Sequence, residues 1–384
     1  MPASISVRRP PPWLAAAVVA SGWSALYSVV QWVRLFMVAP LHDDVRLYYL
    51  AAQAGLRHGW STIYDPTVLR SLSSSLPDTA RAIDVKTFAS TPLLAWMFVP
   101  FVAFPIPVAY VLWTALSLGA IVFTWRIAAP YAGLAKLTLL LLAIGLGPVL
   151  LTLYFGQPSM ILSALVAAAW WLCVKDKQVA AGAVLAVALF LKPQSVILLP
   201  AALLVSGRYR VVAAWAAGCA LLGAASVASL GSTGLLGWWH VITAIRGLPL
   251  DTVFTLAQPL GAGPLTYLVW GLEGATALWV AWRRRGELEI VFAVGILGTV
   301  ATASYFHNSD YSVLIVAAWL VLRTSPALWH RLWLLVGILP MQLLLTGFLA
   351  GPQLIWDGVW LAILAVTSFQ PAGAAYLRLR AQLP

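Results

Sequence analysis

Four short polar segments stand out in a chain that is otherwise strongly apolar. The first runs from His42 to Tyr49 and carries two adjacent carboxylates, Asp43 and Asp44. A carboxylate held in a partly dry cavity gains proton affinity and can act as a general base. The alternative is a solvated loop in which Asp44 caps the helix that follows. Taken alone, the local sequence favours the loop.

A second polar segment, Gly156-Gln157-Pro158-Ser159, joins two apolar runs. The amide of Gln157 can donate and accept hydrogen bonds, so it could orient a sugar hydroxyl. The alternative is a helix break formed by Gly156 and Pro158, in which Gln157 is merely a polar residue at the membrane–water interface. Taken alone, this segment favours the helix break.

The third segment places Lys192, followed by Pro193 and Gln194, between two short apolar runs. An ionisable side chain within such helices is costly, which makes it a candidate for function. Lys192 either extends its ammonium to the interface or holds a phosphate, with Gln194 and the next helix N-terminus as further donors. The sequence supports the two interpretations equally.

The fourth segment runs from Ser304 to Tyr311 and contains His307. Its imidazolium could bind a phosphate, or the ring could steer a proton. A polar turn with a surface histidine is the alternative. The chain has no cluster of metal ligands and no glycine-rich nucleotide loop, and both cysteines lie in apolar runs. We therefore expect neither a metal nor a bound cofactor.

The composition indicates which elements must hold these segments. Of the 384 residues, 62% are hydrophobic and 9% are charged, against about 25% charged in an ordinary globular domain. Apolar runs recur along the whole chain, and a bilayer requires that a spanning backbone satisfy its own hydrogen bonds, so we expect an all-α polytopic membrane protein. The net charge of +11 is scattered between apolar runs, which excludes nucleic acid as a partner.

Twelve apolar runs are candidate membrane spans. They lie near residues 12–38, 106–125, 134–154, 158–174, 178–191, 193–206, 211–230, 256–282, 288–303, 311–323, 328–348 and 354–372. A further apolar stretch, 89–104, contains three prolines. If that stretch only dips into the membrane, most of the 23 Lys and Arg residues fall in cytoplasmic loops, as the positive-inside rule requires. Both termini are then cytoplasmic, and the four polar segments share the outer face.

We interpret residues 1–384 as a single membrane domain without internal repeats. Residues 41–105 form the first outer loop, which is long enough for amphipathic helices on the membrane surface, together with the re-entrant stretch 89–104.

Taken in order, the four segments resemble one family, the polyprenyl-phosphate-mannose-dependent α-mannosyltransferases of the GT-C superfamily. This is the glycosyltransferase family 87 type, which includes the mycobacterial phosphatidylinositol mannoside mannosyltransferase. An aspartate followed by an aromatic and Ala-rich helix ending in glycine is matched by Asp44, Val45, Leu47, Tyr48, Ala51, Ala52 and Gly59. The family's later elements resemble Thr91 to Leu94, Gly156 to Ser159, Ala181 to Lys192 and Ser304 to His307. This sequence departs from the family pattern at Ser159, Pro193 and Asn308.

The resemblance implies an inverting transfer of mannose from a polyprenyl-phosphate donor to a lipid or glycan acceptor, at the outer face of a bacterial plasma membrane. Asp44 would be the catalytic base. Lys192, His307 and Gln194 would hold the donor phosphate. The sugar or acceptor would be bound by Gln157, Tyr48, Asp43 and Arg46.

Two other functions remain open on the sequence alone. A twelve-helix secondary transporter would also have helix breaks and a buried lysine. Transporters, however, keep such groups near the bilayer midplane, often in paired repeats, whereas here they gather at one surface. A lipid-linked polysaccharide ligase or flippase is the second alternative.

Overall fold

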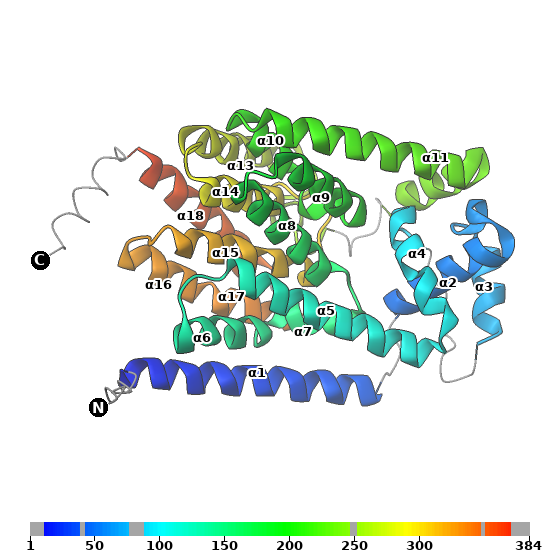
Figure 1. The fold of residues 1–384 in the computed structure, drawn as a ribbon, viewed down its shortest axis with the longest axis horizontal. Helices are drawn as coiled ribbons and strands as arrows, with labels where there is room; N and C mark the ends of the chain where they lie inside the picture. The colour runs from blue at the N-terminus through cyan, green and yellow to red at the C-terminus, as the bar shows by residue number, and fades with distance from the viewer. Residues whose placement is uncertain (1–10, 39–42, 77–87, 246–251, 347–349, 370–384) are drawn as a thin grey trace, which may run out of the picture.

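The computed structural model describes residues 11–38, 43–76, 88–245, 252–346 and 350–369. Of these residues 83% are helical, and no strand occurs among them. This agrees with the all-α fold that the sequence predicts. In Figure 1 most helices run roughly along the long axis of the molecule, and α2, α3 and α4 gather at one end of it.

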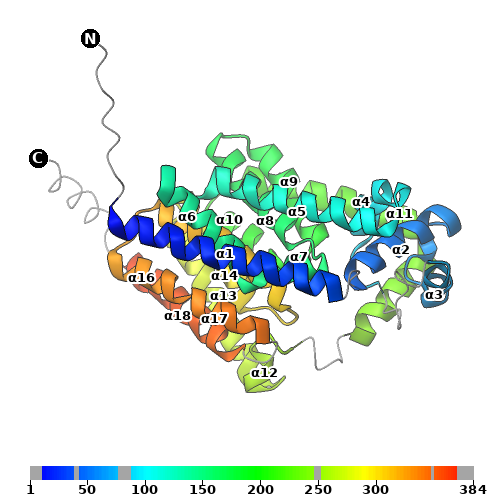
Figure 2. The same cartoon turned by 90° about the horizontal axis from the view of Figure 1, so that it is seen from below.

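Among the described residues, three helices are long and apolar enough to cross a bilayer: α1 (Pro12–Val38), α5 (Ile106–Ala128) and α11 (Tyr209–Ile245). Within the most apolar stretch of each helix, only 17% of the residues of α1 and 11% of those of α11 are buried within the protein. Many of their apolar side chains, such as Trp23 and Val38 of α1, are exposed, as in helices that contact lipid. Figure 2 shows α1 lying lengthwise across the bundle. The structure thus supports a membrane protein, while the count of twelve spans stays a prediction.

The predicted span 134–154 is broken into α6 (Gly133–Ile144) and α7 (Gly147–Phe155), which meet at 56°. The break frees the carbonyl of Gly145, a group that cannot stay unpaired in an apolar environment. Ser28 of α1 donates to it at 3.2 Å, and Gln342 donates to it at 2.6 Å. With α6 and α7 counted together as one span, the part of the chain that the structure describes has four spans that meet the criteria of length and composition.

The other apolar runs form shorter helices at or near the predicted positions. These are α8 (Ser159–Val174), α9 (Gln178–Leu191), α10 (Leu198–Val205), α12 (Ala257–Leu260), α13 (Pro264–Arg283), α14 (Leu288–Ala301), α15 (Leu314–Arg323), α16 (Leu328–Val336), α17 (Ile338–Leu343), η7 (Leu344–Thr346) and α18 (Gly351–Ser368). The element labelled α11 consists of two helices that meet at Gly231, where φ is +60° and the backbone is not helical. The first of them therefore ends where the sequence predicts, at residue 230.

The predicted first outer loop contains α2 (Asp43–His58), η1 (Trp60–Thr62), α3 (Pro66–Ser74), α4 (Pro92–Phe98) and η3 (Val99–Ala103). Most of α2 is buried, because it packs against α3, α4 and η3. Together α4 and η3 cover twelve residues, fewer than the ~20 that a full span needs. Whether this pair enters the membrane stays a prediction.

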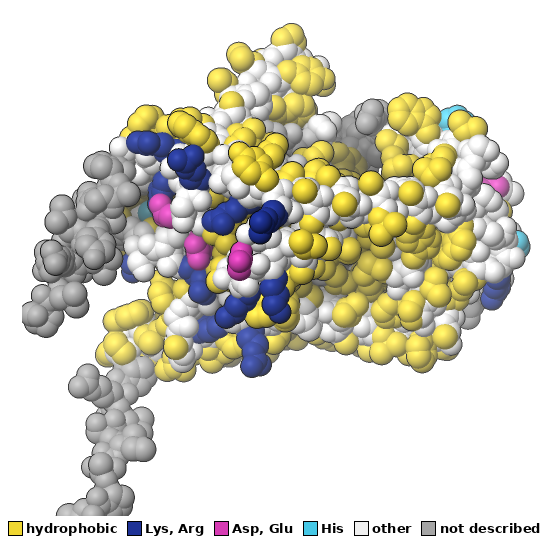
Figure 3. All heavy atoms as spheres, turned by 45° about the horizontal axis from the view of Figure 1, so that its top comes forward, with side chains coloured by type: hydrophobic (Ala, Val, Ile, Leu, Met, Phe, Trp, Pro, Cys, Tyr) yellow, Lys and Arg dark blue, Asp and Glu magenta, His cyan; other side chains and the backbone are white. Residues whose placement is uncertain are grey.

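Charge is distributed unevenly over the surface. In Figure 3, Lys and Arg side chains gather over the left part of the face shown, and hydrophobic side chains cover most of the rest. A basic band beside a broad apolar surface is what the positive-inside rule predicts for the cytoplasmic end of a membrane protein. The assignment of that end to the cytoplasm stays a prediction.

Candidate functional site

Three of the predicted residues form one hydrogen-bonded chain. Gln157 Nε2 donates to Asp44 Oδ2 at 2.5 Å, and Lys192 Nζ donates to Gln157 Oε1 at 2.8 Å. Because an amide has one donating and one accepting end, these two bonds fix the orientation of the Gln157 side chain. Asp44 lies 113 positions before Gln157 in the sequence, and Lys192 lies 35 positions after it, so the fold brings the three together.

The ammonium of Lys192 has two further partners. It donates to Ser159 Oγ at 3.0 Å and forms an ion pair with Asp310 Oδ1. Ser159 Oγ in turn donates to Asp310 Oδ1 at 3.2 Å. Lys192 is 5% exposed, and Ser159 and Asp310 are fully buried. A buried ammonium is costly unless it is paired, and this carboxylate supplies the pairing.

Gln157 owes its position to a tight turn at the end of α7. Gly156 ends that helix with φ at +71°, a left-handed conformation that glycine adopts without strain. Its carbonyl accepts a hydrogen bond from Trp113 Nε1 at 2.7 Å. A Cβ at Gly156 would lie 2.0 Å from Cγ2 of Val45, the residue after Asp44. The missing side chain therefore allows α2 to approach Gln157.

Lys192 lies where the chain leaves α9. Its φ of −156° and ψ of 82° are not helical, and Pro193 then opens the short turn η4 (Pro193–Ser195). Proline cannot continue a helix, so the end of α9 is set by the sequence. The hydroxyl of Thr91 donates to the carbonyl of Phe190, which ties the start of α4 to this helix end.

Asp310 lies in η6 (Asn308–Val313), and His307 is the residue just before that turn. The backbone N–H of His307 donates to Asp310 Oδ2 at 3.1 Å, so this carboxylate bonds to Lys192 through one oxygen and to its own turn through the other. The imidazole of His307 is directed elsewhere, because its Nε2 lies 2.7 Å from the hydroxyl of Tyr305. His307 therefore joins the site through its backbone rather than its ring.

Tyr48 lies one helical turn after Asp44, on the same face of α2. Its ring packs edge-on against Phe98 and Trp113, with centroids 5.3 and 6.4 Å apart. Burial, and then the nearby carboxylates of Asp44 and Asp310, raise the pKa of Tyr48 well above its usual value. The hydroxyl keeps its proton at neutral pH and well into the alkaline range, so it can donate a hydrogen bond to a bound ligand.

The remaining predicted residues are less closely connected. Gln194 lies in η4 and is partly exposed, and among the described residues no hydrogen bond joins it to Lys192. Arg46 is partly buried and lies two positions after Asp44, so it points to a different side of α2. Asp43 begins α2, but its side chain, like all of His42, lies outside the described residues.

The sequence interpretation missed the role of Asp310 as the ion-pair partner of Lys192. It included Asp310 in the fourth polar segment, Ser304 to Tyr311, but assigned it no role. A signal was available, since Lys192 needed a counter-ion and the outer loops offered few carboxylates. The choice among them depends on how η6 packs against α7 and α8, which local sequence does not reveal.

The arrangement has an open side and a buried side. Asp44, Gln157, Tyr305 and His307 are partly exposed, whereas Ser159, Lys192 and Asp310 are buried. A ligand that reaches this site therefore meets the carboxylate of Asp44 and the amide of Gln157 first, with the ion pair beneath. These groups can accept a proton, orient hydroxyls and bind an anion.

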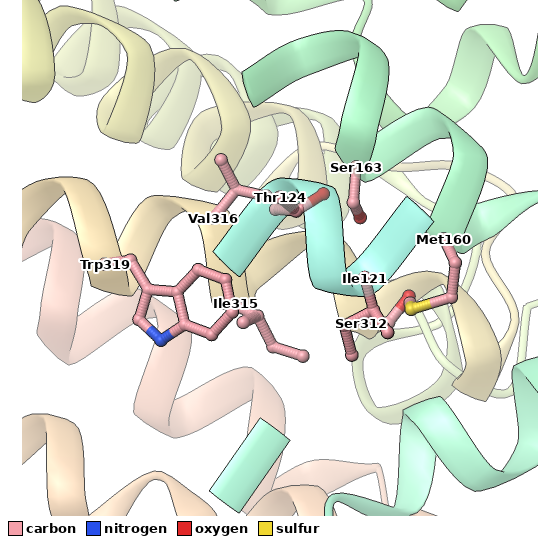
Figure 4. Close-up of a pocket in the computed structure, with 8 residues that line it drawn as sticks. All are labelled: Ile121, Thr124, Met160, Ser163, Ser312, Ile315, Val316 and Trp319. Atoms are coloured by element: carbon pink, nitrogen blue, oxygen red, sulfur yellow. The ribbon is translucent and has the colours of Figure 1, made fainter. Parts of the chain in front are cut away.

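Two cavities in the described structure lie near these elements. Neither of them is lined by the hydrogen-bonded residues of the candidate site. The first, shown in Figure 4, has a volume of about 10 Å³ between α5, α8 and α15. It has room for about one water molecule and none for a sugar. The second, of about 160 Å³, is almost wholly apolar and lies between α6, α15, α16 and α17. Within the described chain, no group of three or more His, Cys, Asp or Glu residues is placed to hold a metal ion.

Comparison with known protein families gives one match. The model of glycosyltransferase family 87 matches residues 88–313. The matched segment includes Gln157, Ser159, Lys192, His307 and Asp310, while Asp44 precedes it. No curated protein and no solved structure matches the chain. Because the match covers more than half of its length, the chain belongs to glycosyltransferase family 87 and is a glycosyltransferase.

Proposed function

We propose that this protein transfers mannose, with inversion, from a polyprenyl-phosphate donor to a lipid or glycan acceptor at the outer face of the membrane. The main supporting observation is the chain in which Gln157 links the carboxylate of Asp44 to the ammonium of Lys192. It combines a base and a cation within one small site. Sugar transfer from a phosphate leaving group requires both.

The proposed reaction is a single displacement. The oxygen of an acceptor hydroxyl attacks the anomeric carbon while Asp44 accepts the hydroxyl proton. The bond between that carbon and the phosphate oxygen breaks on the opposite side, and polyprenyl phosphate leaves with the bonding electron pair. Attack opposite the leaving group inverts the anomeric centre, so a β-linked donor gives an α-linked product.

The partners of Lys192 constrain how a phosphate can enter. An ammonium group has three N–H donors, and Gln157, Ser159 and Asp310 already use three. A donor phosphate must therefore displace one of these acceptors to bind Lys192. We propose that it displaces a neutral acceptor, Gln157 or Ser159, because displacing Asp310 would leave that buried carboxylate without its counter-ion.

The remaining predicted residues would complete the site around the sugar. His307, with its ring partly exposed beside Tyr305, would turn toward the phosphate as a second cation. Gln194 would be a further phosphate donor. Tyr48, Gln157, Asp43 and Arg46 would orient the sugar or the acceptor.

In this proposal, Lys192 and His307 neutralise the charge of the donor phosphate, and no metal ion is needed for that. Chelation with EDTA should therefore leave the transfer rate unchanged, which is measured on purified protein with and without added Mg²⁺ or Mn²⁺. A rate that falls on chelation and returns with one of these ions would contradict this assignment.

The test of the function itself is an in vitro transfer assay. Purified protein receives polyprenyl-phosphate mannose, glucose, arabinose or aminoarabinose, each with a panel of lipid and glycan acceptors, and GDP-mannose as the comparison donor. We expect transfer from polyprenyl-phosphate mannose and none from the nucleotide sugar. Transfer from a different lipid-linked sugar would replace mannose in the proposal, and the absence of turnover with every donor would overturn it.

A further inference from the structure

A second group of polar side chains, two of them buried and one half-buried, lies between α13 and α18. Glu273 is near the middle of α13, and Gln353 and Asp357 lie in the first two turns of α18. Gln353 and Asp357 are 0% and 1% exposed. Carboxylates in the interior of a membrane domain are expensive, so such residues are retained where they bind something.

The three side chains form a compact cluster. Gln353 Nε2 donates to Asp357 Oδ1 at 2.9 Å. A Cβ placed on Gly358 would lie 3.3 Å from Glu273 Oε1, which puts that carboxylate against the backbone beside Asp357. Gly358 thus permits the close approach of the two helices that brings both acids together.

Three oxygens of this cluster have no donor. Glu273 Oε2, Asp357 Oδ2 and the amide oxygen of the fully buried Gln353 are all buried without a hydrogen-bond partner in the described structure. All three are acceptors, and no Lys, Arg or His of the described chain pairs with either carboxyl. A buried oxygen left without a donor loses its hydration and gains nothing in exchange.

From these observations we propose that Glu273, Gln353 and Asp357 bind a small monovalent cation, with sodium as the ion to test. Carboxylate and amide oxygens are the ligands that hard cations prefer. A divalent ion would need about six oxygens, and the described residues contain no group of three acidic or histidine ligands. One sodium ion would offset one of the two carboxylate charges and give all three acceptors a partner. The proposal does not depend on the function proposed above.

The experiment measures binding of radioactive ²²Na⁺ to the purified full-length protein in a choline-based buffer. We expect one saturable sodium site per chain, together with a melting temperature that is higher in sodium chloride than in choline chloride at equal ionic strength. Asp357→Asn and Glu273→Gln should each abolish saturable binding and the sodium-dependent rise in melting temperature. Two variants are used so that one remains informative if the other does not fold.

Asp176→Asn is the matched control, because Asp176 is exposed in the turn between α8 and α9, away from the cluster. It should bind sodium as the wild type does. The proposal is overturned if wild-type protein shows no saturable sodium binding, which would mean that the two carboxyl groups are simply protonated. It is also overturned if a folded Asp357→Asn or Glu273→Gln variant still binds sodium, or if Asp176→Asn loses binding.

Discussion

At the scale of single residues, the ion pair between Lys192 and Asp310 contributes most clearly to the arrangement of the site. Both side chains are buried, and the pair also holds Ser159 and Gln157 in place. Removing one member of a buried ion pair leaves an uncompensated charge, which costs about 3–5 kcal/mol. The pair is therefore as much a structural feature of the site as a chemical one.

A double-mutant cycle tests this interpretation. Lys192→Met and Asp310→Leu should each lower the free energy of unfolding by about 3–5 kcal/mol, while the double variant should lose clearly less than the sum. The measurement is chemical unfolding of the purified protein in detergent. Additive losses would mean that the two side chains do not depend on each other.

The pKa of Tyr48 gives a prediction about alkaline pH. Burial and the charges of Asp44 and Asp310 raise this pKa in the folded protein, whereas an unfolded tyrosine ionises near pH 10. Above about pH 10 the unfolded chain therefore releases a proton that the folded chain retains, and the free energy of unfolding falls as pH rises.

Tyr48→Phe should reduce this alkaline loss of stability, as seen in melting temperatures between pH 8 and pH 11. Tyr209→Phe is the control, because Tyr209 is 67% exposed on α11. If both variants lose stability with pH as the wild type does, Tyr48 is not the group responsible.

At the scale of elements, the close contact between α2 and the end of α7 positions the base. Gly156 has φ at +71°, and its missing Cβ leaves room for Val45. Alanine in this left-handed conformation costs about 1–2 kcal/mol, and the added methyl group would also push α2, and with it Asp44, away from Gln157.

Gly156→Ala should therefore lower both stability and the transfer rate. Adding Val45→Ala removes the clash but not the backbone strain, so the double variant should recover most of the transfer rate and only part of the stability. The measurements are melting temperature and initial transfer rate. Equal rates for Gly156→Ala and wild type would show that the spacing between α2 and α7 is not critical.

Sequence patterns predicted individual helices better than their breaks. The ranges 12–38 and 178–191 agree with α1 and α9, because charged, proline-rich or polar residues bound each apolar run. The break between α6 and α7 was missed, since it depends on donors from Ser28 and Gln342, far away in the sequence.

The candidate site shows the same division. Asp44, Gln157 and Lys192 could be selected from the sequence because each is polar in an apolar context, and the structure joins them, although their roles stay predictions. The pairing of Lys192 with Asp310 and the contact of His307 with Tyr305 arise only when η6 packs into the bundle. No local pattern contains that information.

At the scale of the whole molecule, the central prediction concerns the membrane. Basic side chains gather toward one end, and α2, α3 and α4 form the other. If the basic end is cytoplasmic, the candidate site opens to the outside, where a lipid-linked donor rather than a nucleotide sugar would be used.

Cysteine labelling checks this orientation. In a Cys173→Ala/Cys219→Ala background, Ser71→Cys on α3 should react with a membrane-impermeant maleimide on intact cells. Lys175→Cys, at the end of α8, should react only after the cells are permeabilised. Both positions are exposed, so reagent access to each differs only by the side of the membrane. The reverse labelling pattern would contradict the proposed topology.

The most direct measurement for the whole account compares Asp44→Asn with Asp65→Asn in the transfer assay. Asp65 caps α3 at the surface, where asparagine caps equally well, so its variant controls for loss of a carboxylate in the same region. We expect Asp44→Asn to remain folded and bind the donor but to lose about 10²–10⁴-fold in rate, while Asp65→Asn keeps the wild-type rate. A folded Asp44→Asn variant that transfers sugar as fast as the wild type would contradict the account.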